Sequence, residues 1–124
     1  MRTAAVILVA ALAAPSAAGT YNTTPVQTAA TEGLQCMISN VGTAPVTVTA
    51  VLLDVTGAAI TPVGDVCQSG FGGELPAGAT CGVVYAGSTF ARCTVTASSS
   101  RIRAALSVVD NTGRMTLSVP ATKK

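Results

Sequence analysis

The chain has 124 residues, of which 49% are hydrophobic and 10% charged, and its formal net charge is +2. A balance so close to neutral supplies no large field for attracting nucleic acid, so nucleic acid is not expected as a partner. The chain contains no histidine, which excludes Ser-His-Asp and Cys-His catalysis.

The first segment has the layout of a secretory leader. Arg2 precedes an apolar run over residues 4–14, and small residues follow Pro15. This order of a positive start, an apolar stretch and small residues predicts a signal peptide over residues 1–19, cleaved after Ala18 or Gly19. The run is shorter than the roughly 20 apolar residues that span a bilayer. We therefore expect a secreted or periplasmic protein that does not span the membrane once the leader is removed.

The remaining residues, 20–124, are enough for one domain with one core. Residues 20–25 are expected to form an irregular lead-in, and residues 26–31 an edge segment. Apolar residues alternate over 33–40, which predicts a strand with one buried face. Residues 46–55 are rich in Val and Thr and predict the next strand. There the apolar set changes parity after Ala50, which indicates either a bulge or burial of both faces.

The middle of the chain is rich in turn residues. Asp54-Val55-Thr56-Gly57 predicts a hairpin turn. Residues 58–63 predict a return strand that Pro62 either ends or places at a sheet edge. Residues 64–78 contain five glycines and are expected to be irregular. A structureless stretch of this length is usually functional or held in place by other contacts.

The last part again alternates strand and turn patterns. Strands are predicted over 80–86, 90–97, 102–109 and 114–119, with a second hairpin turn at Asp110-Asn111-Thr112-Gly113 and a short tail over 120–124. Seven to eight short strands at regular spacing predict an all-β fold, either an antiparallel sandwich or a small barrel.

Four cysteines follow the leader, at positions 36, 67, 81 and 93. In an exported protein an even set of cysteines predicts disulfides, and three pairings can be drawn. Cys36 and Cys93 each share a strand face with apolar neighbours, as a bridge between two sheets requires. We therefore expect Cys36–Cys93 to link the sheets and Cys67–Cys81 to hold the Gly-rich segment. A zinc site is the alternative, but the chain has no C-x-x-C pair and no histidine.

The stretch from Cys36 to Val48, with the pattern Asn-x-Gly-Thr-x-Pro-Val and a following Leu-Leu-Asp hairpin, resembles exported bacterial immunoglobulin-like domains. Leu75-Pro76-Ala77-Gly78 before Cys81 is similar to a group of small exported bacterial proteins without an assigned function. The resemblance covers residues 33–57 and continues more weakly to 119. It implies an immunoglobulin-like antiparallel β-sandwich, cross-linked by disulfides.

Candidate functional residues are few. Phe71, in Gly70-Phe71-Gly72-Gly73, either covers the edge of the core or forms an exposed contact. Arg92, Arg101 and Arg103 lie near one end of neighbouring predicted strands, where they would form a basic patch for an anionic glycan or remain solvent-facing charges.

Asp65 and Glu74 flank the Gly-rich segment and are either an acid–base pair or solvated loop charges. No cofactor or metal site is expected from the sequence.

The expected function is a non-enzymatic binding or structural module outside the cytoplasmic membrane, which contacts a protein or glycan of the cell envelope through the loop over 64–78. Two alternatives stay open at this point. One is a subunit of a surface fibre or adhesive assembly that joins its neighbours by strand pairing. The other is a hydrolase of envelope polymers.

Overall fold

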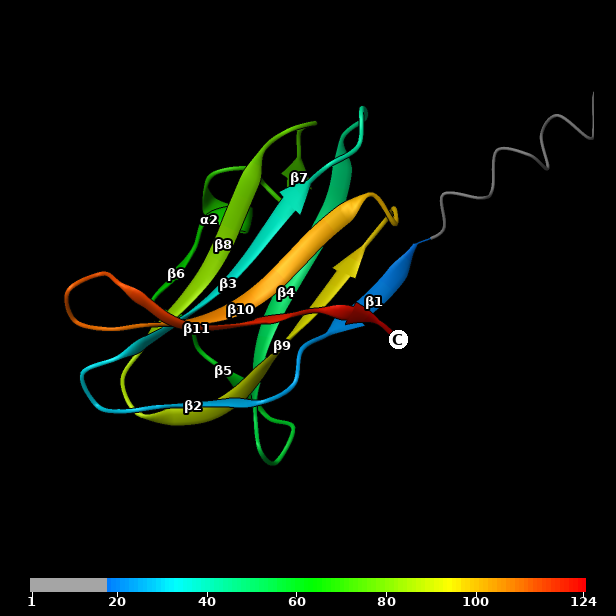
Figure 1. Cartoon of the computed structure of the whole chain (residues 1–124). Coiled ribbons are helices and arrows are strands. Elements are labelled where there is room, and N and C mark those ends of the chain that lie inside the picture. Colours follow the sequence, from blue (N-terminus) through cyan, green and yellow to red (C-terminus); the bar gives the residue numbers. More distant parts are fainter. Residues whose placement is uncertain (1–17) are drawn as a thin grey trace, which may run out of the picture.

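A computed structural model describes residues 18–124, and these form two antiparallel sheets that pack as a sandwich (Figure 1). The seven-stranded sheet contains β12 (Thr122–Lys123), β1 (Gly19–Asn22), β9 (Thr89–Ala97), β4 (Val46–Asp54) and β5 (Ala59–Ile60), with β2 (Val26–Thr28) beside β9 and β7 (Glu74–Leu75) beside β4. The five-stranded sheet has the order β11 (Met115–Pro120), β10 (Ile102–Val109), β3 (Gly33–Asn40), β8 (Thr80–Ala86) and β6 (Gly64–Asp65). The predicted leader, 1–19, lies outside the described residues except for its last two positions.

The core lies between the sheets and follows the predicted alternation. Even-numbered residues of β3 are buried along its whole length, and they lie opposite buried or half-buried residues of β8 and β10. Odd-numbered residues of β9 from Ala91 to Ala97 are buried on the facing sheet. The two inner faces meet at the Cys36–Cys93 disulfide, and the second disulfide joins Cys67 to Cys81. Both bonds have the predicted pairing.

Strand β4 settles the question raised by its change of apolar parity. Its register with β9 runs without a shift from Val48 to Asp54, so there is no bulge near Ala50. Leu52 continues the buried set, while Val51 and Leu53 lie half-buried on the opposite, outer face. The apolar residues of the second parity therefore belong to the outside of the sandwich.

The two predicted hairpin turns have the same internal hydrogen bonding. In the first, Oδ1 of Asp54 accepts hydrogen bonds from the Thr56 amide and hydroxyl, at 2.8 and 2.6 Å, and from the Ala58 amide at 3.1 Å. Asp110 makes the equivalent bonds in the second turn. The glycine that ends each turn, Gly57 or Gly113, has a φ of 85°, which residues with a side chain rarely adopt.

The expectation that residues 64–78 are irregular is wrong. They contain β6, the short helix α2 (Val66–Ser69) and β7. Asp65 caps the helix, because its Oδ1 accepts a hydrogen bond from the Gln68 amide at 3.1 Å. The sequence missed these elements because each is four residues long or less, and they are held by tertiary contacts such as the Cys67–Cys81 bond.

The ends of the domain also differ from expectation. Of the expected irregular lead-in over 20–25, residues 20–22 belong to β1, which pairs with β9, and only 23–25 lie outside a strand. The expected tail includes β12, which pairs with β1. Figure 1 shows the C-terminus beside β1. The return strand expected over 58–63 is reduced to the two residues of β5. These short edge strands are defined by their partners far along the chain, which local patterns do not reveal.

Strand β11 departs from simple alternation. Its pairing with β10 shifts between Val108 and Val109, so that Leu117 lies opposite Val108 but Met115 lies opposite Val109. This irregularity leaves Thr116 without a partner and turns Met115 to the other face from Leu117. Met115 and Leu117 are 56% and 47% exposed.

Candidate functional site

The segment expected to be the contact loop is a packed part of the domain. Phe71 is half-buried and packs against the core. Its neighbours are fixed by backbone hydrogen bonds, among them Gly73 N to Cys67 O at 2.8 Å and Val48 N to Gly73 O at 2.9 Å. Of the two interpretations offered by the sequence, this geometry fits a residue that covers the edge of the core.

The three arginines of the predicted basic patch are not brought together. Arg92 lies on β9 beside Cys93, whose side chain points into the core, so Arg92 points out of the seven-stranded sheet. Arg103 lies beside buried Ile102 on β10 and therefore points out of the other sheet. Arg101 lies in the link before β10, with its backbone amide bonded to Ser99 Oγ at 3.1 Å. Arg92 and Arg103 thus occupy opposite outer faces of the sandwich.

Asp65 and Glu74 are also separated by the fold. Asp65 belongs to β6 in the five-stranded sheet and caps α2, whereas Glu74 belongs to β7 in the seven-stranded sheet. Of the hollows found on the described residues, one is lined by Asp65 and none of these is lined by both carboxylates. Their arrangement gives no paired acid and base.

A different surface stands out on the outer face of the seven-stranded sheet. Pairing of β4 with β9 places Leu53 opposite Arg92. Phe90 lies two residues before Arg92 on the same face, and Val55 lies in the turn that follows β4; they are 45% and 67% exposed. With Pro25 and the Asp54–Gly57 turn, these residues line a hollow of about 430 Å³, which we call the outer hollow. Its full lining is Pro25, Leu53, Asp54, Val55, Thr56, Gly57, Phe90, Ala91 and Arg92.

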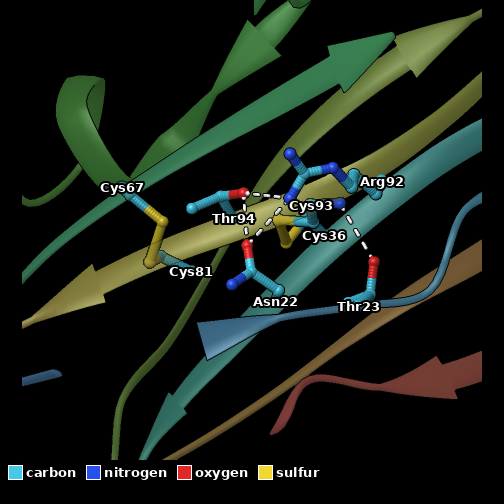
Figure 2. The surroundings of a disulfide bond; sticks show 8 residues. All are labelled: Asn22, Thr23, Cys36, Cys67, Cys81, Arg92, Cys93 and Thr94. Carbon is cyan, nitrogen blue, oxygen red and sulfur yellow. Dashed lines mark hydrogen bonds between the residues drawn. A yellow bond between two sulfur atoms is a disulfide. The ribbon is translucent and has the colours of Figure 1, made fainter. Parts of the chain in front are cut away.

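Arg92 is held in place by a small polar network (Figure 2). Its Nη1 donates a hydrogen bond to Asn22 Oδ1 at 3.0 Å and makes a longer contact of 3.4 Å with Thr94 Oγ1. The Thr94 hydroxyl in turn donates to Asn22 Oδ1 at 2.8 Å. The three residues come from β1 and β9, which are paired with Asn22 opposite Thr94. The guanidinium is therefore positioned by neutral groups of its own sheet.

The backbone under this network is fixed as well. Just after β1, the buried Thr23 accepts a hydrogen bond from the Cys93 amide at its Oγ1, and its own amide donates to the Cys93 carbonyl, both at 3.0 Å. Figure 2 shows the Cys36–Cys93 bond directly beside this contact. The strand that carries Arg92 is thus anchored to the opposite sheet through a covalent bond at the neighbouring residue.

The turn at one side of the outer hollow contains a carboxylate, that of Asp54, whose charged form is stabilised by hydrogen bonds. Hydrogen bonds from the Thr56 hydroxyl, and then from the Thr56 and Ala58 amides, lower the pKa of Asp54 below its ordinary value. Asp54 lies opposite Ala91 in the register, whose side chain is buried. Its carboxylate therefore has the parity of the inner face and closes the turn, while Arg92 belongs to the outer face.

The sequence named Arg92 but missed its apolar neighbours. The signal that could have found them was the second apolar parity of Val51, Leu53 and Val55, which pointed to an apolar strip outside the core. Phe90 precedes Arg92 by two residues and has the same parity. Sequence alone could not show that these two strips lie side by side, because β4 and β9 are far apart in the chain.

A second hollow, of about 560 Å³, lies between the corner at 41–46 and the link at 98–101. Two of its polar side chains are already engaged, since Ser98 Oγ accepts from the Thr47 amide and Ser99 Oγ from the Arg101 amide. It has no aromatic residue in its lining. The outer hollow is therefore the stronger candidate for recognition.

Within residues 18–124, no helix is long and apolar enough to cross a bilayer, and no group of three His, Cys, Asp or Glu side chains is placed to hold a metal ion. The two disulfides indicate an oxidising environment.

No protein-family model matches the chain, and no curated protein matches its sequence. One solved structure is similar, the crystal structure of Thermotoga maritima 1070, with a TM-score of 0.58 over 87% of this chain and 96% of that one. The two sequences are 9% identical over this match. The likeness therefore extends to the arrangement of the strands, and at this identity it shows the fold alone.

Proposed function

We propose that the protein is a non-enzymatic binding module that works outside the cytoplasmic membrane and contacts its partner through the outer hollow. The observation that carries this proposal is the exposure of Phe90 and Val55 beside the fixed Arg92. Apolar side chains gathered on the outside of a sandwich add little to its core, and such patches commonly mark interaction sites. Arginine and aromatic residues are also the side chains enriched at contact surfaces.

The proposed location rests on the two disulfides together with the predicted leader. A secreted or periplasmic protein meets the oxidising conditions that such bonds need. We also propose that the sandwich is of the immunoglobulin-like type that the Cys36–Val48 stretch resembles. The bridge between the sheets at Cys36–Cys93 supports this assignment.

The proposal that the protein is not an enzyme is supported by its residues. The chain has no histidine, and Asp65 is engaged in capping a helix. A hydrolase of envelope polymers therefore has less support than a binding module.

Assembly through strand pairing also has less support. Three of the outermost strands, β5, β6 and β12, have two residues each, and β11 contains an irregular pairing and ends at Pro120. Short strands, bulges and proline are features that protect sheet edges from pairing with other chains.

The test is a capture experiment with matched variants. Protein made from the full-length chain in an exporting host is immobilised and exposed to envelope extract and culture medium from the natural source. We expect Phe90→Ser to lose the molecules that the wild type retains. Leu117→Ser is the control, because Leu117 is 47% exposed and Phe90 45%, and Leu117 lies in the other sheet. Identical capture by wild type and Phe90→Ser, or equal loss in both variants, would contradict the assignment of the surface.

A further inference from the structure

We infer that the outer hollow binds an amphipathic monoanion, in which one carboxylate lies next to a compact apolar group. This inference rests on the proposed function, and it adds the chemical class of the ligand. It follows from the charge of the hollow, from the spacing of its apolar side chains and from its size.

The charge of the hollow comes from Arg92. Both of its side-chain hydrogen bonds within the described residues use Nη1, and both acceptors are neutral. A guanidinium has five N–H donors, so those on Nε and Nη2 remain for a ligand. A planar carboxylate fits such a pair of donors well. Asp54, the carboxylate in the lining, has the parity of the inner face and uses Oδ1 within its own turn.

The charge also fixes how many negative groups the ligand carries. The lining holds one arginine, no lysine and one carboxylate, that of Asp54. A second negative group on the ligand would find no further cation in this lining and would lie near Asp54. A ligand with a single carboxylate therefore fits the lining better than a doubly charged phosphate.

The apolar part of the ligand is set by strand geometry. Leu53 lies directly across from Arg92, and neighbouring strands are about 5 Å apart. Phe90 is two residues from Arg92 along β9, a distance of about 7 Å. These are separations between backbone positions, and the guanidinium itself reaches toward Asn22 and Thr94. The ligand must therefore join a carboxylate at Arg92 to an apolar group that covers Leu53 or Phe90. Short fatty acids and the carboxyl-terminal residue of a peptide both meet this requirement.

The size of the hollow limits what can occupy it. Its volume of about 430 Å³ lies in the lower part of the range of about 300–1,000 Å³ found for small-molecule sites. One small molecule, or the last residue of a chain, fills such a space. The rest of a longer ligand would lie over the exposed ring of Phe90.

The test compares carboxylates with neutral molecules of the same shape. Backbone amide signals of ¹⁵N-labelled protein, made from the full-length chain in an exporting host, are followed by NMR during addition of octanoate, N-acetyl-leucine, octan-1-ol or N-acetyl-leucinamide. We expect shifts over residues 53–57 and 90–92. Each carboxylate should bind at least about threefold more tightly than its neutral partner, as for a solvent-exposed ion pair. The carboxylate with the larger margin distinguishes a fatty chain from a peptide end.

Two arginine variants test whether Arg92 causes the tighter binding of the carboxylates. Arg92→Gln should remove the advantage of the carboxylates. Arg103→Gln makes the same change of charge on the opposite face and should keep it. If Arg92→Gln does not fold, the comparison of ligand pairs on the wild type still decides.

Shifts in the hollow that are equal for carboxylates and neutral partners would overturn the ligand class and leave the binding surface standing. An advantage that survives in a folded Arg92→Gln variant would also overturn it. If none of the four molecules shifts these signals, the inference fails, while the capture experiment with Phe90→Ser separately decides the proposed function.

Discussion

The two disulfides should differ in how much they stabilise the fold. Cys36–Cys93 spans 57 residues and Cys67–Cys81 spans 14. When a cross-link restricts the unfolded chain, the entropy model gives about 4.2 kcal/mol for the long loop and about 3.0 kcal/mol for the short one. All four cysteines are buried, so replacing either pair by alanine removes similar buried volume. The pair Cys36→Ala/Cys93→Ala should therefore lower stability by about 1.2 kcal/mol more than Cys67→Ala/Cys81→Ala.

The assay is thermal unfolding of the oxidised double variants, followed by circular dichroism at fixed pH and salt. For a domain of this size, a difference of about 1.2 kcal/mol corresponds to about 5–9 °C in Tm. Replacing both cysteines of a pair leaves no free thiol to exchange with the remaining bond. As the control, both variants are denatured, reduced and refolded in reductant before the same measurement. Neither variant then has a disulfide, so the difference in loop length no longer affects their stability.

Equal melting temperatures, or a lower one for the short-loop variant, would refute the reasoning. In that case the stabilisation would come from contacts in the folded state, for example from fixing α2 against β8, and not from the restricted unfolded chain.

Three further changes test the packing and the turns. Asn40 is buried, and its Nδ2 donates to the carbonyls of two segments at 2.8 and 2.9 Å; Asn40→Asp should cost about 3 kcal/mol or more in urea unfolding, because both carbonyls lose their donor. Tyr21→Phe should raise stability by about 1 kcal/mol in the same assay, because the Tyr21 hydroxyl is buried without a hydrogen-bond partner among the described residues. Hydrogen bonds, first of all from the threonine two residues further on, lower the pKa of Asp54 and of Asp110 in the folded state. A carboxyl whose pKa is lower in the folded than in the unfolded state stabilises the fold above the unfolded pKa, and this contribution is lost as pH falls through the folded pKa. Tm should therefore fall below about pH 4, and it should fall less in the Asp54→Asn/Asp110→Asn variant.

The long strands were predictable from local pattern alone. The strands at Gly33–Asn40, Thr80–Ala86 and Ile102–Val109 have the bounds that the sequence indicated. Each has apolar residues at alternate positions and a turn signal at one or both ends, so burial and local geometry agree. The disulfide pairing could be predicted for the same reason, since Cys36 and Cys93 share the buried parity of their strands.

What the sequence did not reveal depends on contacts between distant segments. The strand at Gly19–Asn22 is defined by pairing with residues near 95 and 123. Of the two alternatives for Arg92 and Arg103, the structure favours separate solvent-facing charges, because the two residues lie in different sheets. Similar positions along two strands do not reveal which layer each strand joins. The outer hollow needed both the parity of Leu53 and its register with Arg92, and register between distant strands is a property of the fold.

The pairing of the first strand with the last has a consequence for when the domain can form. Synthesis runs from the N-terminus, yet β1 pairs with β9 and β12, so both of its partners are made long after it. Until then its backbone amides and carbonyls have no ladder to join, and Cys36 has no Cys93 to meet. Long-range pairing of this kind slows folding and prolongs the exposure of unpaired strands. The sheets can therefore close only after β9 and β12 have been made, and a nascent chain stalled before residue 93 should remain open to proteases.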